Sequence, residues 1–286
     1  MALLKAALVC SEPLDDANER IRVFVSILPQ AYFVERVGGG RVDVSVMVGP
    51  GHSPATYEPM PKQMAELSRA KLYFRIGVPF ENVWMERISK ANPDMKVVDT
   101  RKGIGLMSMK GHNHAGFQAE RQNGGLKDPH IWLSLRLTRT VAQNIYEALV
   151  SEDPLHQSSY QDNLRAFHYD LDDLDAEIAE IVKNDATRKF MVFHPAWGYF
   201  AQDYALEQIP IETEGKEATA KGLARVIKEG RKEGIKVIFV QKQFSEKSAA
   251  TVANAIGGRV IQIDPLARDY LNNMKKIAQI FAEVLQ

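Results

Sequence analysis

The chain has 286 residues, of which 45% are hydrophobic and 25% are charged, as in an ordinary globular protein with room for two sizeable cores. Its 36 basic and 36 acidic side chains balance, so the overall charge gives no reason to expect a nucleic acid or another polyanion as a partner. A single cysteine, Cys10, excludes an intrachain disulfide and a cysteine-rich metal site.

The segment before Cys10 is apolar except for one lysine. It is similar to the tail of an export signal, with the cysteine where a lipoprotein anchor would sit, but a whole signal needs about 15–30 residues. A cloning remnant or a misassigned start is the alternative interpretation. No run of the sequence approaches the ~18 apolar residues of a membrane-spanning helix.

Short β-rich segments alternate with helical patterns along most of the chain. The helical patterns include residues 61–69, 135–149 and 248–256, and Ser134 is a suitable N-cap for the second of them. Strands that alternate with helices are typical of parallel sheets in an α/β fold. The predicted strands are residues 21–28, 42–48, 71–76, 95–99, 190–193, 237–240 and 260–263.

One long helix is predicted near the middle of the chain, from about residue 155 to residue 183. Apolar residues recur there at alternating spacings of three and four from Tyr160 to Ile181, and acidic residues occupy the other faces. Such a helix is roughly 40 Å long. We expect it, at residues 154–184, to join a lobe at residues 18–153 to a second lobe at residues 185–286, each a parallel sheet flanked by helices.

Four residues have the character of metal ligands and similar positions relative to the predicted elements. His52 follows a strand, His130 precedes a helix, and His194 and Asp264 each follow a strand. Side chains just past the carboxyl ends of strands commonly contact ligands in open α/β sheets. Imidazole nitrogens with one carboxylate oxygen suit Zn²⁺, bound at about 2.0–2.2 Å, and suit Mn²⁺ less well.

The order and spacing of four motifs resemble the metal-specific solute-binding proteins of bacterial ABC importers, the zinc and manganese group. The resemblance runs from about Ile21 to the C-terminus and includes the long linking helix. It implies a metal site in the cleft between two lobes, with His130, His194 and Asp264 as ligands. The motifs are residues 50–59, which end in Tyr-Glu-Pro, and residues 128–134, 193–200 and 261–266.

The resemblance also implies a function outside the cytoplasm. The expected protein is a non-enzymatic, monomeric receptor, periplasmic or lipid-anchored on the outer face of the cytoplasmic membrane, that delivers its ion to an ABC-type permease. Its manganese-binding members tend to carry a carboxylate where this chain has His194, so this residue favours zinc over manganese.

One position departs from the family pattern. A ligand histidine usually lies two residues before the tyrosine of Tyr-Glu-Pro, and this chain has Ala55 there. Either His52 supplies the ligand from another point of the same loop, which is our preferred interpretation, or water fills the gap. Glu58 is a weaker candidate. Three histidines with Asp264 would form a closed site, which binds rather than catalyses.

Two other functions remain open from the sequence. A zinc hydrolase could use a metal-bound water with Glu58 as general base, although the sequence has no His-Glu-x-x-His pair. A surface protein with a structural metal and an adhesive role is the second.

Several residues near the predicted site carry secondary predictions. Asp128 could orient His130, while Trp132 and Trp197 could pack the cleft wall. The polar composition of residues 107–127 indicates a loop, and its His112 and His114 form either a second weak metal site or a solvated pair.

Overall fold

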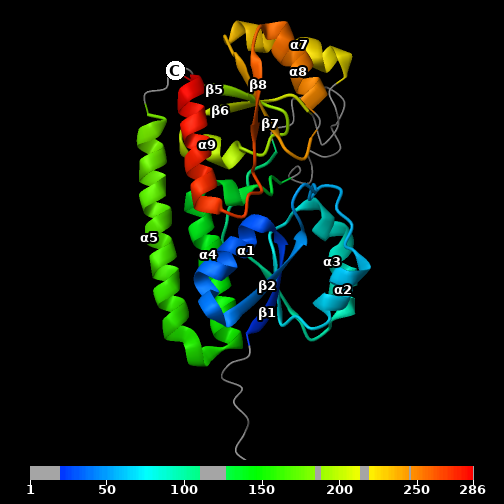
Figure 1. Cartoon of the computed structure of the whole chain (residues 1–286), viewed down its shortest axis with the longest axis vertical. Coiled ribbons are helices and arrows are strands. Elements are labelled where there is room, and N and C mark those ends of the chain that lie inside the picture. Colours follow the sequence, from blue (N-terminus) through cyan, green and yellow to red (C-terminus); the bar gives the residue numbers. More distant parts are fainter. Residues whose placement is uncertain (1–19, 110–126, 184–187, 213–218, 245, 286) are drawn as a thin grey trace, which may run out of the picture.

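The computed structural model describes residues 20–109, 127–183, 188–212, 219–244 and 246–285. Figure 1 shows two sheets, one above the other, with α5 (Gln157–Ile181) running along one side of the molecule past both of them. The first sheet region contains β1 (Ile21–Ile27), α1 (Leu28–Gly38), β2 (Val42–Val48), α2 (Pro61–Leu67), β3 (Leu72–Arg75), α3 (Pro79–Ala91), β4 (Lys96–Asp99) and α4 (Leu135–Glu152). The second contains β5 (Lys189–Val192), α6 (Gly198–Asp203), β6 (Glu207–Pro210), α7 (Ala220–Lys232), β7 (Val237–Gln241), α8 (Glu246–Ile256), β8 (Arg259–Ile263) and α9 (Tyr270–Leu285).

Both sheets are parallel and have the same strand order. The first runs β2-β1-β3-β4 and the second β6-β5-β7-β8. Each places its first strand in the interior, where helices cover both faces, so β1 and β5 are almost continuously buried. In β5, Phe190 and Val192 belong to the large core that contains Phe281 of α9, whereas Met191 packs in a smaller core with α7 and α8. The predicted α/β fold is confirmed.

One strand was not predicted. β6 is short, half polar and ends in Pro210, which removes a backbone donor. It lies at the edge of its sheet, where a proline is tolerated because one side of the strand needs no partner. Sequence periodicity alone does not identify such an edge strand.

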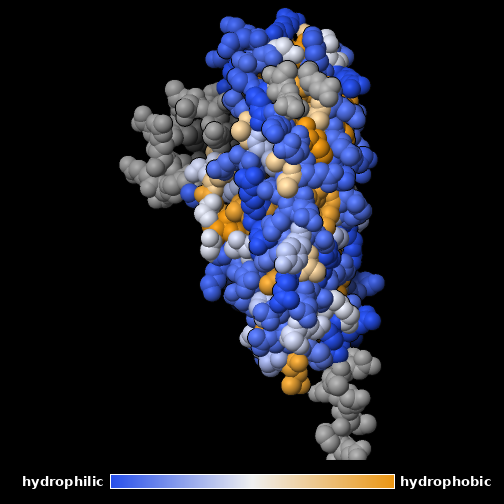
Figure 2. Space-filling model, turned by 90° about the vertical axis from the view of Figure 1, so that its left-hand side faces the viewer, coloured by the Kyte–Doolittle hydropathy of each residue, from blue (hydrophilic) through white to orange (hydrophobic). Residues whose placement is uncertain are grey.

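The long helix forms close to its predicted limits. A short 3₁₀ turn, Pro154–His156 (η5), precedes α5, and the apolar stripe from Tyr160 to Ile178 is buried against α1, α4 and α9. The exposed face on this side of the molecule is mostly hydrophilic, with hydrophobic residues in scattered patches (Figure 2). Because α5 packs on helices that follow strands of both sheets, it connects the two halves through one continuous core. The exact residue limits of the lobes stay a prediction.

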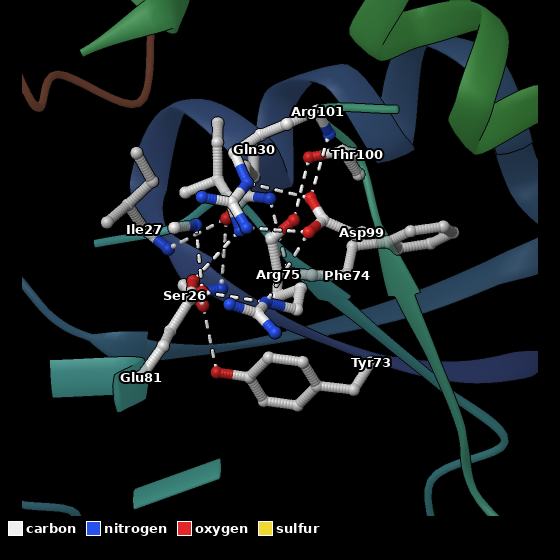
Figure 3. Close-up of polar contacts among 12 residues, drawn as sticks. Ser26, Ile27, Gln30, Tyr73, Phe74, Arg75, Glu81, Asp99, Thr100 and Arg101 are labelled. Atoms are coloured by element: carbon white, nitrogen blue, oxygen red, sulfur yellow. Dashed lines mark hydrogen bonds and ion pairs between the residues drawn. The ribbon is translucent and has the colours of Figure 1, made fainter. Parts of the chain in front are cut away.

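The pairing of β1 with β3 ends at Val25 and Phe74, and just beyond it the Gln30 side chain bonds to both strands (Figure 3). Such a point, where the strand order reverses, is the usual ligand crevice of an open α/β sheet. Here the Gln30 carbonyl oxygen accepts the backbone N–H groups of Ser26 at 3.1 Å and Ile27 at 3.3 Å. Its amide nitrogen donates to the carbonyl of Phe74 at 3.2 Å.

The buried carboxylate of Glu81 completes this closure. It accepts hydrogen bonds from the Ser26 hydroxyl at 2.6 Å and from the backbone N–H groups of Ile76 at 2.9 Å and Gly77 at 2.8 Å. Arg75 donates to it at 3.3 Å and neutralises its charge. The first sheet therefore fills its own crevice with protein groups.

Candidate metal centre

The corresponding crevice of the second sheet, between β5 and β7, holds His194. Gln241, the last residue of β7, fixes its backbone from both sides: the Gln241 amide donates to the His194 carbonyl at 2.7 Å and accepts the His194 N–H at 3.3 Å. The Phe244 ring stacks on the imidazole, with centroids 5.1 Å apart and planes 25° apart. The ring of His194 is thus oriented while its Nε2 atom is left for other contacts.

That Nε2 atom faces the Nε2 atom of His130 at 3.2 Å. The other nitrogen of each ring contacts a buried carboxylate. Nδ1 of His130 lies 2.7 Å from Oδ1 of Asp128, and Nδ1 of His194 lies 2.6 Å from Oε1 of Glu212. The two carboxylate side chains are only 5% and 2% exposed, so water competes little for them.

The two carboxylates determine where the imidazole protons lie. A carboxylate accepts, so each Nδ1 carries the hydrogen and donates it, as metal-ligating histidines commonly do. The pKa of the His130 imidazole is lowered by burial and, less, by the nearby His194, although Asp128 opposes this, so the ring is neutral at pH 7. In this tautomer the two rings direct their Nε2 atoms toward each other, where one cation could bind both.

The spacing suits a tetrahedral zinc ion. Two Zn–N bonds of about 2.0–2.1 Å at the tetrahedral angle place their nitrogens about 3.3–3.4 Å apart. The observed 3.2 Å between the Nε2 atoms of His130 and His194 needs only a small adjustment. The pair could therefore hold one edge of a zinc coordination tetrahedron.

Hydrogen bonds from second-sheet elements fix the segment that carries His130, residues 128–134. The Tyr199 hydroxyl of α6 donates to the Asp128 carbonyl at 3.0 Å. The Trp132 indole N–H donates to the Pro265 carbonyl at 2.8 Å, and the Tyr270 hydroxyl of α9 donates to the Trp132 carbonyl at 2.7 Å. Although this segment precedes the long helix in the chain, it is attached to the same half of the molecule as His194.

Asp264 follows β8 and has two differently engaged oxygens. Oδ1 accepts the Leu266 N–H at 2.9 Å, and Oδ2 lies 3.6 Å from Nζ of Lys242. The Asn273 amide donates to its backbone carbonyl at 2.7 Å. The bond from Trp132 to Pro265 ties this turn to the His130 segment.

His52 is exposed on the loop between β2 and α2. With Tyr57 and Glu58 it lines a cavity of about 150 Å³. Its ring meets the Tyr57 ring edge-on at 5.7 Å, and the Tyr57 hydroxyl donates to Gln63 at 2.5 Å. The cavity is also lined by Ser53, Thr56 and Met60.

The structure joins only part of the predicted ligand set. Across residues 20–109, 127–183, 188–212, 219–244 and 246–285, no group of three or more histidine, cysteine or acidic side chains is placed to hold a metal together. His130 and His194 are in direct contact, whereas neither His52 nor Asp264 completes a three-member group with them. The four-residue set stays a prediction.

Of the two carboxylates that contact the histidine pair, Asp128 was predicted and Glu212 was not. Asp128 contacts His130 as expected, and Trp132 and Trp197 are both buried. Glu212 was missed because it follows the unpredicted strand β6. The only sequence signal is an acid directly after the apolar run Ile209-Pro210-Ile211. The predictions for Cys10, His112 and His114 fall outside the described residues.

Comparison with known proteins identifies the family. Residues 23–284 match the family described as zinc-uptake complex component A, periplasmic (ZnuA). The chain belongs to the ZnuA family. This membership confirms the predicted resemblance to metal-specific solute-binding proteins of ABC importers. No helix within the described ranges is both long enough and apolar enough to cross a membrane.

Individual known proteins are similar to this chain along most of its length. A putative metal-binding protein of Chlamydia trachomatis is 31% identical over 285 residues, covering 99% of this chain and 98% of that protein. The high-affinity zinc uptake system protein ZnuA of Bacillus subtilis is 27% identical over 257 residues, covering 88% and 80%. The crystal structure of a ZnuA deletion mutant with zinc bound is 41% identical, with a TM-score of 0.87 and coverage of 94% and 99%.

Proposed function

We propose that this protein is the periplasmic zinc-binding receptor of an ABC-type importer and delivers the ion to a membrane permease. One observation carries the proposal. His130 and His194 turn their Nε2 atoms toward each other at 3.2 Å while buried carboxylates hold both Nδ1 atoms. That arrangement is prepared for a cation before one arrives, and imidazole favours zinc over the harder manganese. Manganese is the alternative cargo.

Asp264 and His52 complete the proposed ligand set. Asp264 supplies a carboxylate oxygen and one negative charge, and His52 supplies a fourth ligand from its loop, or a water takes that position. With four protein ligands the ion has no open site for a reacting water, which is the property of a carrier rather than a hydrolase. The receptor acts as a monomer, and a lipid anchor at Cys10 stays a prediction.

Binding measurements on single-histidine variants test this function. Zinc titration against a competing chelator should give about one equivalent per chain, and His194→Ala should weaken binding by more than the roughly 10–100-fold typical of losing an outer-shell partner. His156→Ala is the matched control, because that histidine contacts Asp153 at the far end of α4. Unchanged zinc affinity in His194→Ala would refute the assignment.

A further inference from the structure

Sheet register places a lysine against the carboxylate of Asp264. Gln241, the last residue of β7, pairs with Ile263, the last residue of β8. The residues that directly follow these two strands, Lys242 and Asp264, therefore lie side by side at the carboxyl edge of the sheet. Two residues further along the chain from Lys242, Phe244 stacks on His194, so this strand end borders the metal centre.

The lysine ammonium lies next to the Asp264 oxygen that does not accept the Leu266 N–H. Oδ1 of Asp264 is already used by the Leu266 N–H at 2.9 Å, which holds the turn. Oδ2 is the oxygen that lies 3.6 Å from Nζ of Lys242. A metal ion bound through Oδ2 of Asp264 would therefore compete with the Lys242 ammonium for the lone pairs of that oxygen.

We propose that Lys242 is a built-in competitor of the metal ion, which neutralises Asp264 in the metal-free protein and weakens zinc binding so that the ion can be handed on. The inference rests on the proposed function, because it takes Asp264 as a zinc ligand. Lys242 is well suited to leave. Its side chain is 58% exposed, whereas that of Asp264 is 21% exposed, so the ammonium can move into water while the carboxylate stays in place.

The expected effect is modest because the ion pair is solvated. Exposed pairs contribute about 0.2–1 kcal/mol, which corresponds to roughly a 1.4- to 5-fold change in an equilibrium constant. Repulsion between the ammonium and a divalent cation acts in the same direction. Removing the charge should therefore tighten zinc binding, which is the opposite of what removing a structural contact would do.

The test compares zinc affinity and dissociation rate in Lys242→Met, Lys242→Arg and the wild type by chelator competition. Lys242→Met keeps the apolar stem without the charge and should bind zinc about 1.4- to fivefold more tightly and release it more slowly. Lys242→Arg should match the wild type. Lys90→Met is the control, because Lys90 is an exposed lysine of α3 that also forms an ion pair, with Glu86 at 2.6 Å.

The dependence of zinc affinity on salt distinguishes an effect of the Lys242 charge from an effect of packing. Raising the ionic strength from about 0.01 M to about 1 M shortens the screening length from ~30 Å to ~3 Å, so the affinity gap between wild type and Lys242→Met should narrow. The inference is overturned if Lys242→Met binds zinc like the wild type, if Lys90→Met tightens binding equally, or if the gap is independent of salt. Each result would leave the proposed function intact if His194→Ala still weakens binding as expected.

Discussion

The buried carboxylate of Glu212 offers the sharpest test of how the metal centre is prepared. Glu212→Gln keeps an oxygen that can accept the His194 Nδ1–H, now 2.6 Å from Oε1, but removes the negative charge. Because the Glu212 side chain is only 2% exposed, water cannot compensate for the lost negative charge. Nε2 of His194 therefore becomes a less basic ligand for the metal. We expect zinc binding to weaken about 10–100-fold, or about 1.4–2.7 kcal/mol, in chelator competition.

The same substitution should leave the metal-free protein folded. The introduced glutamine carries no charge, and its side-chain oxygen can still accept the His194 Nδ1–H, so no buried polar group is left unpaired. Urea unfolding of the metal-free variant checks this. Glu207→Gln, at the start of the strand that Glu212 follows, is the matched control: Glu207 is 62% exposed beside Lys189, and the variant should keep wild-type zinc affinity. If Glu212→Gln bound zinc as tightly as the wild type, the carboxylate would have no role in preparing the ligand.

Four further results are expected. Because burial lowers the pKa of His130, the unfolded chain binds that proton more readily, and the free energy of unfolding of the metal-free protein should fall as pH drops below about 6.5, measured by urea titration. His52→Ala should weaken zinc binding in calorimetry, and adding Ala55→His should restore it; no loss would mean that water holds that position. Phe281→Ala, which removes the ring between Phe190 and Phe239, should destabilise the fold by about 3–5 kcal/mol in thermal or urea unfolding without changing zinc stoichiometry. Since α5 packs on both halves, small-angle scattering should show no large change in shape on zinc binding, and a lobe rotation of tens of degrees would contradict this.

Local patterns predicted the features that are local. The apolar stripe of α5 was readable because residues three and four apart share a helix face, and the helix ends within a few residues of its predicted limits. The contact between Asp128 and His130 spans two positions in the chain. Such short-range relations are contained in the sequence itself.

Relations set by strand pairing could not be read in the same way. Glu212 reaches His194 because Val192 of β5 pairs with Pro210 of β6, which brings the two following segments together. The pairing depends on an edge strand whose sequence resembles a loop. Lys242 reaches Asp264 through the same kind of register between β7 and β8. The position of His52 relative to the histidine pair depends on a loop that has no periodic pattern.

The two sheets share one strand order, so each has an equivalent crevice, and the two crevices are under different selective constraints. Gln30 and Glu81 satisfy buried backbone groups at the strand ends of the first sheet, so substitutions there should lower stability and with it the amount of folded protein. Substitutions at Gln241 or Glu212 act on the crevice that borders the histidine pair, and a cell would notice them through growth under metal scarcity. The same structural unit is thus used twice. Selection on the first copy acts through the stability of the fold, and selection on the second acts through metal uptake.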